Sequence, residues 1–267
     1  MQDLKRIAII GGGNLGASIA AGLIHCGFSE PSALWITRRN PDLLAEFRDQ
    51  GVRVGSDNRE AVRQSGVVII SLKPYNALEV LEEIRPDLDP ERHLLISVVT
   101  GLFMENIVSV TGPKIPVFRA MPNTAIALRE SVTCICHSGA SESQVKWVTG
   151  LFSQLGVAVP IDEKLMDAAT VLGACGIAYA LRFIRANIQG GIEIGFDAKT
   201  ASLIAAQTAK GAAELLIRGN RHPEQEIDKV TTPKGCTIAG LNEMEHQGFS
   251  SSLIKGITAS YNKILKG

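Results

Sequence analysis

A glycine-rich turn near the start of the chain restricts the possible folds more than any other feature of the sequence. A short apolar run, Ile7–Ile10, predicts a buried strand that leads directly into the pattern Gly11-x-Gly13-x-x-Gly16. The small residues at 17–26 follow with helical spacing. Strand, glycine turn and helix in this order form the unit that holds a dinucleotide pyrophosphate. The turn therefore predicts a nucleotide-binding α/β domain, and the alternative is a glycine turn without a ligand.

Each glycine of the pattern meets a separate physical requirement of the predicted site. Gly11 allows the tight turn, Gly13 lets the backbone approach the phosphates without a Cβ in the way, and Gly16 lets the helix pack closely on the strand. The free N–H groups at the helix start then face the anionic pyrophosphate. The predicted cofactor loop consists of Gly11, Gly13, Asn14, Leu15 and Gly16.

Composition and charge limit the partners of the chain. Its 267 residues are 45% hydrophobic and 20% charged, which is typical of a packed globular protein of one or two domains. The 27 basic and 27 acidic residues cancel, so bulk electrostatics gives no reason to expect binding to nucleic acid or to a membrane surface. We therefore expect a small-molecule ligand, which can still be anionic, and neither of those partners.

The cysteines and the apolar segments bear on the compartment. The five cysteines are odd in number and form no Cys-x-x-Cys pair, so we expect neither a disulfide framework nor a zinc site. The first strand begins near Arg6, which leaves no room for a signal peptide. The longest uncharged segment of the helical half, residues 168–181, is shorter than the ~20 residues of a bilayer span. These observations predict a cytoplasmic protein without a bound metal.

Strand and helix patterns alternate up to about residue 161. Further strands are predicted at residues 33–37, 51–54, 67–72, 93–99, 116–119, 132–136 and 157–160. Helices are predicted between them at residues 42–50, 58–64, 76–84 and 141–155, and Ser141-x-x-Gln144 has the sequence of a capping box. Repeated alternation of this kind predicts a doubly wound α/β domain with a largely parallel sheet.

The pattern changes near Ile161, where strand signals stop and only helical spacing remains. We predict one long helix over residues 166–195, further helices over 198–218 and 224–229, and two more, the last beginning near Ser250. The domain boundary is therefore expected at about residue 162. The long helices have more apolar surface than a small domain buries alone, which predicts association with a second copy. The alternative is burial against the first domain.

The residues after the second predicted strand indicate which dinucleotide is bound. A preference for NAD would place an Asp or Glu there, about 20 residues past the glycines, to bond the ribose 2′-hydroxyl. The chain has Arg38 and Arg39 instead, and no carboxylate before Asp42. Two guanidinium groups suit a 2′-phosphate, so the pair predicts NADPH, with NADH as a weaker cofactor. The alternative is that both arginines lie on a solvated turn.

Several segments along the chain add a more specific pattern. They are Gly11–Gly16, Asp57–Val62, Leu72–Pro74, Ser97–Gly101, Arg119–Thr124 and Val230–Gly240. In this order they resemble the pyrroline-5-carboxylate reductase family over nearly the whole chain. The resemblance implies a Rossmann-type NADP-binding domain over residues 1–162 and an all-helical substrate and dimerisation domain over residues 163–267. It also implies a homodimer or a ring of dimers, joined through the C-terminal helices.

The resemblance further implies a reaction and a set of cofactor contacts. In that family NADPH delivers a hydride to the C=N carbon of 1-pyrroline-5-carboxylate and gives L-proline, the last step of proline biosynthesis. The protein has to hold the imine carbon near the nicotinamide and fix the carboxylate, which agrees with the lack of a Ser-His-Asp set or paired acids. Beyond the glycine loop and the two arginines, the implied cofactor residues are Asn58, Ser71, Lys73, Pro74 and Asn123.

The same resemblance implies where the substrate binds. Thr237 lies beside the imine nitrogen as the catalytic residue, and the carboxylate binds Thr232 and the amides around Gly235, Cys236 and Thr237. Without the resemblance, Thr237 is better interpreted as a helix N-cap, and the two roles are compatible. Lys234 stands where the family usually has glycine, and Cys236 where it usually has threonine. The lysine removes a position free to take positive φ, yet adds a cation that can attract a carboxylate.

A further departure from the family lies at residues 173–179, Gly-Ala-Cys-Gly-Ile-Ala-Tyr, where Ser-Gly-Ser-Gly-Pro-Ala-Tyr is usual. The departures keep open a reductase of another cyclic imine and a non-catalytic dimeric protein that binds NADPH. A β-hydroxyacid reductase would need a catalytic lysine on the first long helix, and no lysine occurs between Met166 and Ala198. We expect Cys175 and Cys236 to pack as small apolar residues.

Overall fold

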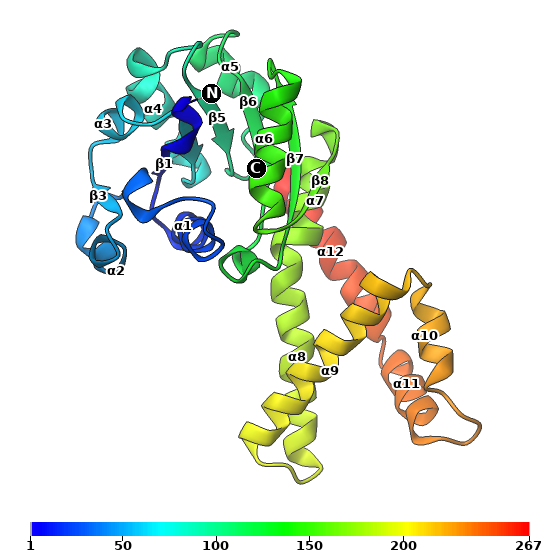
Figure 1. Ribbon diagram of the computed structural model, residues 1–267. Coiled ribbons are helices and arrows are strands. Elements are labelled where there is room, and N and C mark those ends of the chain that lie inside the picture. The colour runs from blue at the N-terminus through cyan, green and yellow to red at the C-terminus, as the bar shows by residue number, and fades with distance from the viewer. Residues whose placement is uncertain (1, 267) are drawn as a thin grey trace. The chain divides into compact units, whose positions relative to one another are not determined.

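The structure of the protein is a computed structural model that describes residues 2–266. The chain separates into two compact units: residues up to Cys175 together with those from Lys263, and residues Gly176–Asn262 (Figure 1). The expected boundary at residue 162 lies between the last strand, which ends at Pro160, and a short 3-10 turn, Glu163–Leu165. The assignment of separate functions to residues 1–162 and 163–267 stays a prediction.

The first unit is built on one sheet. Within the described residues this sheet has eight strands in the order β3-β2-β1-β4-β5-β6-β7-β8. Neighbouring strands pair in parallel except for β6 and β7, which pair antiparallel. The doubly wound prediction is confirmed, and β7 and β8 run opposite to the other six described strands, which the sequence pattern did not indicate. The strands are β1 (Ile7–Ile10), β2 (Leu34–Thr37), β3 (Arg53–Gly55), β4 (Val67–Ile70), β5 (Leu94–Ser97), β6 (Val117–Met121), β7 (Ser131–Ser138) and β8 (Gly156–Pro160).

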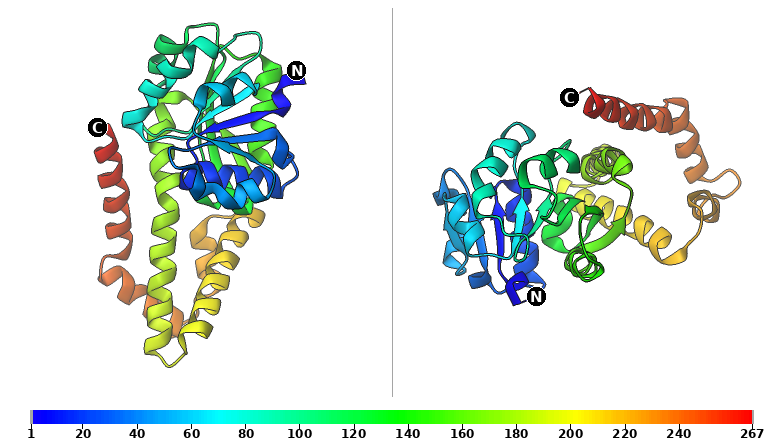
Figure 2. Two further views of the ribbon diagram at one scale, coloured as in Figure 1. Left: turned by 90° about the vertical axis from the view of Figure 1, so that its left-hand side faces the viewer. Right: turned by 90° about the horizontal axis from the view of Figure 1, so that it is seen from above.

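Helices cover both faces of this sheet (Figure 2). They are α1 (Asn14–His25), α2 (Ala45–Asp49), α3 (Asn58–Arg63), α4 (Pro74–Ile84), α5 (Met104–Thr111), α6 (Glu142–Ser153) and α7 (Met166–Ala169). The sequence patterns predicted these helices except α5, whose eight residues the strand signals on either side had obscured, and α7, which they merged into one longer helix. The capping box at the start of α6 is confirmed, because Ser141 accepts from the Gln144 backbone and the Gln144 side chain accepts from the Ser141 backbone.

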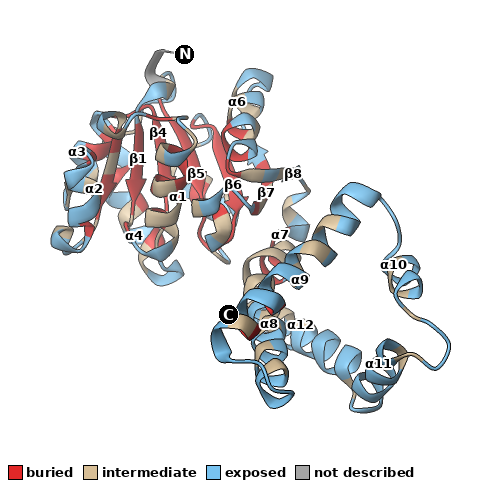
Figure 3. Ribbon diagram, turned by 60° about the horizontal axis from the view of Figure 1, so that its bottom comes forward, coloured by how far each residue is buried: buried red, intermediate tan, exposed pale blue. Residues whose placement is uncertain are grey.

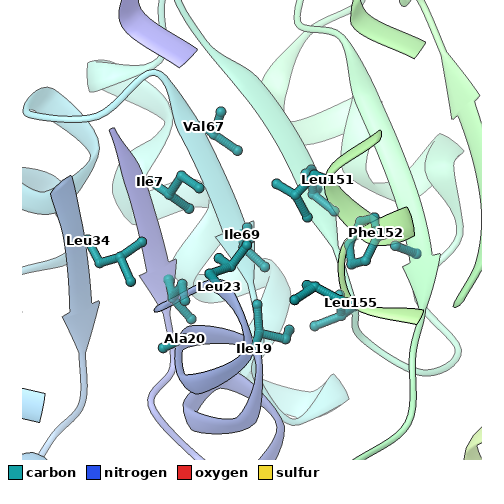
Figure 4. Close-up of a cluster of buried hydrophobic side chains, with 14 of the residues drawn as sticks. Ile7, Ile19, Ala20, Leu23, Leu34, Val67, Ile69, Leu151, Phe152 and Leu155 are labelled. Carbon is teal, nitrogen blue, oxygen red and sulfur yellow. The ribbon is translucent and has the colours of Figure 1, made fainter. Parts of the chain in front are cut away.

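The apolar runs of the central strands follow from burial on two faces. In β1, Ile7 and Ile9 face one core with α1 and α6, whereas Ala8 and Ile10 face the other with α3, α4 and α5. Figure 4 shows the first of these cores, with Leu23 of α1 near Ile69 of β4 and with Phe152 between Leu151 and Leu155. Each fully buried isoleucine contributes about 1.5–3 kcal/mol. Both sides of the sheet are therefore completed within the first unit.

The second unit consists of helices alone. They are α8 (Gly176–Glu193), α9 (Ala198–Gly219), α10 (Pro223–Lys229), α11 (Cys236–His246) and α12 (Phe249–Leu265). Asp197 caps α9 by accepting from the Lys199 and Thr200 backbones, and a hydrogen bond from the Thr200 side chain, together with these backbone bonds, lowers the pKa of its carboxyl. Ala201 of α9 packs on Gly191 of α8, where an added Cβ would lie 3.2 Å from the alanine Cβ. Of the described residues in these helices, only Ala201 and Ala205 are buried (Figure 3).

The predicted single helix over residues 166–195 is interrupted. A π-helical segment, Thr170–Cys175, separates α7 from α8. Gly173 lies in this segment, and a Cβ there would lie 3.3 Å from Val132, so the wider turn brings the backbone close to β7. The side-chain amide of Asn123 donates to the Gly173 carbonyl at 3.3 Å. Helical periodicity does not distinguish such a turn from regular α-helix, which explains the error.

The helical run Glu163–Glu193 has the length and composition of a membrane span. The sequence had suggested a shorter uncharged segment because Arg182 and Arg185 interrupt it. A single run of this kind is weak support for a membrane span, and an apolar helix surface is equally suited to contact with protein. Only 11% of its most apolar window is buried in the single chain.

Candidate active site

The glycine turn after β1 forms an open cradle in the first unit. Gly11 has a φ of +107°, and a Cβ there would collide with the Ser71 carbonyl after β4. A Cβ on Gly16 would likewise collide with the Gly11 carbonyl, which explains the close passage of α1. Gly13 is different, since no atom lies within 4 Å of where its Cβ would be. It is also the N-cap of α1 and provides no side-chain cap, so the first N–H groups of α1 remain available to an anion.

The cradle is held in place by the end of β2. The backbone N–H groups of Gly11 and Gly12 donate to the Thr37 carbonyl at 3.1 and 2.7 Å. The Arg38 guanidinium donates to the Gly12 carbonyl at 2.9 Å, and its backbone N–H donates to Gly55 at 2.9 Å. Arg38 is thus half-buried and fixed beside the glycines, with further N–H groups free for a phosphate. Arg39 is exposed and makes no side-chain hydrogen bond or ion pair within residues 2–266.

Asn58 belongs to the same edge of the sheet. It is the first residue of α3, whose N-cap is Asp57. The buried Thr37 hydroxyl donates to the Asn58 side-chain oxygen at 2.6 Å, and the Asn58 amide donates to Glu83 at 3.1 Å. The side chain is therefore oriented by two neighbours before any ligand binds. Neither Thr37 nor Glu83 had a sequence signal, because both contacts join elements far apart in the chain.

The turn after β4 brings three further predicted residues to the cradle. Ser71 donates its backbone N–H to the Ile10 carbonyl at 2.8 Å, so this turn lies beside the end of β1. Lys73 is the N-cap of α4 and Pro74 its first residue, and both are exposed. Pro74 loses nothing there, because the first helical N–H has no partner in the helix. The structure thus brings Ser71, Lys73 and Pro74 to the same sheet edge as the glycines.

Most of the hydrogen-bonding groups of Asn123 bond to neighbouring residues of the first unit. It is buried and caps the 3-10 segment Thr124–Leu128, accepting from the Ala125 backbone at 3.0 Å. Its amide donates to the Gly173 carbonyl at 3.3 Å, and its backbone N–H donates to the Ser131 hydroxyl at 3.1 Å. A cofactor contact from Asn123 stays a prediction, while its structural contacts join the end of β6 to the π-helical segment.

The predicted substrate loop lies in the second unit, where α11 begins. Gly235 is the N-cap of α11, makes no side-chain cap and donates its backbone N–H to the Thr232 carbonyl at 2.9 Å. Thr237 is the second helical residue, so its interpretation as the N-cap is wrong. Its exposed hydroxyl has no hydrogen-bond partner among the described residues. The first N–H groups of α11 and this hydroxyl are together available to a ligand.

The structure shows the backbone and the exposure of the two residues, Lys234 and Cys236, at which this loop departs from the family pattern. Lys234 adopts a left-handed conformation with a φ of +59°, the conformation that glycine accepts at no cost. The strain costs this chain about 1–2 kcal/mol. Cys236 is exposed, so the packing role expected for it is wrong for the described chain, whereas Cys175 is half-buried. Lys234 and Thr232 are also exposed, so the loop presents polar groups and a cation.

The remaining titratable groups form no catalytic acid–base pair at the glycine cradle or at the loop before α11. His93 is buried, its Nδ1 accepts from the Asp89 backbone at 2.8 Å, and its Nε2 lies 3.2 Å from the Val62 carbonyl. Burial lowers the pKa of His93, which keeps the ring neutral. Among residues 2–266, no group of three or more His, Cys, Asp or Glu side chains is placed to hold a metal ion. The sequence patterns also did not indicate that charged side chains form a buried cluster around Arg119.

Two family models match the two parts of the chain. Residues 163–266 match the model described as pyrroline-5-carboxylate reductase dimerisation, and residues 6–101 match the one described as NADP oxidoreductase coenzyme F420-dependent. Pyrroline-5-carboxylate reductase 2 of Dictyostelium discoideum is 42% identical over 282 residues, which cover 100% of this chain and 94% of that protein. The chain belongs to the pyrroline-5-carboxylate reductase family. This confirms the resemblance found in the sequence segments.

Other relatives and solved structures of this family agree. Pyrroline-5-carboxylate reductase 1 of Dictyostelium discoideum is 43% identical over 269 residues, covering 96% of this chain but 49% of that protein, so the chain spans about half its length. The crystal structure of Plasmodium falciparum pyrroline carboxylate reductase with NADP bound has a TM-score of 0.90 at 25% identity, covering 98% of this chain and 97% of that one. The fold and the order of the two parts are therefore those of the family.

Proposed function

We propose that the protein is a pyrroline-5-carboxylate reductase, which reduces 1-pyrroline-5-carboxylate to L-proline with NADPH. The observation that supports this most strongly is membership of the family over 94% of the length of a 42% identical relative. The solved family structure from Plasmodium falciparum has NADP bound. The reaction is the last step of proline biosynthesis.

The first unit fits a phosphorylated dinucleotide. The space beside Gly13 and the start of α1 suit a pyrophosphate, because within residues 2–266 no side chain caps those N–H groups. Arg38, fixed on the Gly12 carbonyl, would present its remaining N–H groups to a 2′-phosphate, and Arg39 would add charge from the exposed side. Bound NADPH supplies the hydride for the reduction. Gly11, Gly13, Asn14, Leu15, Gly16, Arg38, Arg39, Asn58, Ser71, Lys73, Pro74 and Asn123 are the proposed cofactor residues.

The second unit supplies the proposed substrate groups. The N–H groups of Gly235, Cys236 and Thr237, together with the Thr232 hydroxyl, would bind the substrate carboxylate at the start of α11. The Thr237 hydroxyl would exchange a hydrogen bond with the ring nitrogen, which fixes the imine without a strong acid or base. Lys234 adds positive charge in the same loop, so the loop selects an anionic substrate.

Self-association belongs to the same proposal. The family model that covers residues 163–266 is a dimerisation model. Large apolar side chains are exposed along the helices that it covers, including Leu181, Ile192, Leu203, Ile217 and Ile254. A patch of this kind is normally covered by protein. We therefore propose a homodimer, alone or as the unit of a ring, formed through the C-terminal helices of a cytoplasmic enzyme.

Purified protein and the absorbance of NADPH test the proposed reaction. The substrates are 1-pyrroline-5-carboxylate, its six-membered homologue and a 3-oxo acid, each assayed with NADPH and with NADH. We expect the fastest oxidation with 1-pyrroline-5-carboxylate and NADPH. Faster turnover of the six-membered imine would assign the site to another cyclic imine. NADPH binding without oxidation of any substrate would contradict the enzyme and leave a binding protein.

A further inference from the structure

A buried ionic cluster lies in the first unit where the sheet meets the start of the helical segment. Arg119 of β6 is only 1% exposed, yet it is charged. Its Nη1 donates to the Glu163 Oε1 at 2.8 Å, and its Nη2 lies 3.9 Å from the Asp167 Oδ1. Its guanidinium carbon lies 5.1 Å from the centre of the Phe103 ring. The cluster therefore joins β6, α7 and the turn after β5.

One carboxylate oxygen makes the decisive contact. The Glu163 Oε1 that accepts from Arg119 also accepts from the Met104 backbone N–H at 2.7 Å. Met104 is the first residue of α5, and the N-cap residue Phe103 provides no side-chain cap. Glu163 thus caps α5 from 59 residues away in the sequence, and a carboxylate is favoured at a helix start. The pair therefore holds Phe103 and Met104, where the turn after β5 ends and α5 begins.

Stability alone does not explain this cluster. The Nε and Nη2 of Arg119 and the Oδ1 of Asp167 are buried without a hydrogen-bond partner among the described residues. Buried charges that are incompletely paired are costly, and apolar side chains of similar volume usually replace them without loss of stability. The neighbouring Cys136 does not compensate, because burial and the Glu163 carboxylate raise its thiol pKa to about 11 and keep it neutral. Buried charges that lower stability in this way are expected where function requires them.

The turn that the cluster fixes lies at the proposed reaction side of the sheet. Strands β1, β4, β5 and β6 run parallel, so the turn after β5 lies at the same edge as the glycine cradle after β1. In a doubly wound sheet the second set of strands receives the second half of the dinucleotide, beyond the pyrophosphate. The turn from Thr100 to Phe103 is therefore in position to limit where the nicotinamide end lies.

We propose that Glu163 and Arg119 are positioning residues for catalysis: they hold the turn after β5 in the geometry that hydride transfer requires. This inference rests on the proposed function for its effect on turnover. Its structural part, that Glu163 orders the turn and the start of α5, stands independently. We assign neither residue a contact with the reacting atoms.

Three variants test the proposal. Glu163→Ala removes the shared acceptor, whereas Glu163→Gln keeps an oxygen at Oε1 for both donors. Asp162→Ala is the matched control, because Asp162 is the adjacent acid and its ion pair with Lys164 is exposed. The measurements are hydrogen exchange of the peptide 100–111 without ligand, the Kd for NADPH, and kcat and KM for the imine. Thermal unfolding checks that each variant is folded.

We expect Glu163→Ala to increase exchange in the peptide 100–111 and to lower kcat about tenfold, with the Kd for NADPH unchanged. Glu163→Gln should recover most of both losses, and Asp162→Ala should match wild type. Unchanged exchange in Glu163→Ala, unchanged kcat, or an equal loss in the alanine and glutamine variants would overturn the proposal. If wild type binds NADPH but turns over no substrate, the proposed function fails, and the exchange result alone then decides the structural part.

Discussion

The α/β unit and the helical unit differ in how they bury apolar side chains. In the first unit, all residues of β1 and β4 are buried, and helices complete the core on both faces. In the second unit, Ala201 and Ala205 are the buried residues of the described helices, while Leu203 is 70% exposed. The first unit thus contains its own core, whereas the apolar side chains of the helical unit stay exposed in the single chain, as the proposed association with a second copy requires. The contrast predicts that the proposed nucleotide site forms in a single chain, whereas the proposed substrate site depends on association with a second copy.

The largest expected effect comes from the exposed face of α9. Leu203→Glu places a charge where a second copy would bury the leucine, which costs several kcal/mol and should dissociate the dimer. We expect turnover to fall by at least about 100-fold while the Kd for NADPH stays within about twofold, because the cradle lies in the other unit. Light scattering gives the mass, and NADPH fluorescence gives the binding.

A control in the first unit sharpens that comparison. Val157 of β8 is 63% exposed, a fraction similar to the 70% of Leu203. It lies outside the part of the chain that the dimerisation model matches. Val157→Glu should therefore keep the mass and the turnover of wild type. Equal dissociation by both substitutions would show that exposure alone does not distinguish the units.

The next effect separates substrate binding from cofactor binding within the enzyme. Thr237→Ala removes a hydroxyl that the chain itself leaves free, and we expect kcat/KM for the imine to fall about 10–100-fold, the value of one hydrogen bond to a charged group. Thr237→Ser should retain most of the activity. Thr258→Ala is the control, since that hydroxyl bonds the Ile254 carbonyl in α12. Full kcat/KM in Thr237→Ala would remove Thr237 from the site.

The arginines after β2 test the cofactor side. Replacing Arg38 and Arg39 together by alanine should raise KM for NADPH about 10–100-fold through lost charged hydrogen bonds and should spare NADH. Arg38 should account for most of the change, because its guanidinium is fixed on Gly12 while Arg39 is exposed. Steady-state kinetics of the single and double variants with both cofactors measures this. Equal losses for NADPH and NADH would contradict a 2′-phosphate site.

The smallest expected effect is on the stability of the first unit with pH. Burial lowers the pKa of His93, so the unfolded chain binds a proton near pH 6.5 that the folded chain resists. The contribution of the neutral ring to stability is complete above about pH 6.5 and is lost as the pH falls toward the lower, folded pKa. As the pH is lowered from about 7.5 to about 5, the Tm of His93→Gln should therefore fall less steeply than that of wild type. An identical slope in both would show that His93 does not contribute.

The sequence predicted the parts of the fold that depend on local pattern. The apolar run Ile7–Ile10, the glycine spacing after it and the capping box at Ser141 each specify a strand, a turn or a helix start from neighbouring residues. Family segments then located the cradle and the α11 loop. The site residues themselves stay predictions that the variants above test.

The missed features depend on contacts between distant segments or on backbone geometry that residue spacing does not reveal. Glu163 bonds Arg119 from 44 residues away, and no periodicity indicates such a pair. The hydrogen bonds of the π-helical segment Thr170–Cys175 span one residue more than those of an α-helix, and the spacing of apolar residues does not reveal so small a difference. Gly235 rather than Thr237 caps α11 because the turn before it, with Lys234 at positive φ, decides where the helix begins.

Hydrogen exchange of wild type and Leu203→Glu, followed by mass spectrometry at one protein concentration, tests the contrast between the units most directly. Wild type should protect amides in both units. In Leu203→Glu, peptides within residues 176–262 should lose protection, while peptides covering β1 and β4 keep it, because only the second unit depends on another copy. Protection retained throughout the variant, or lost equally in both units, would contradict the account.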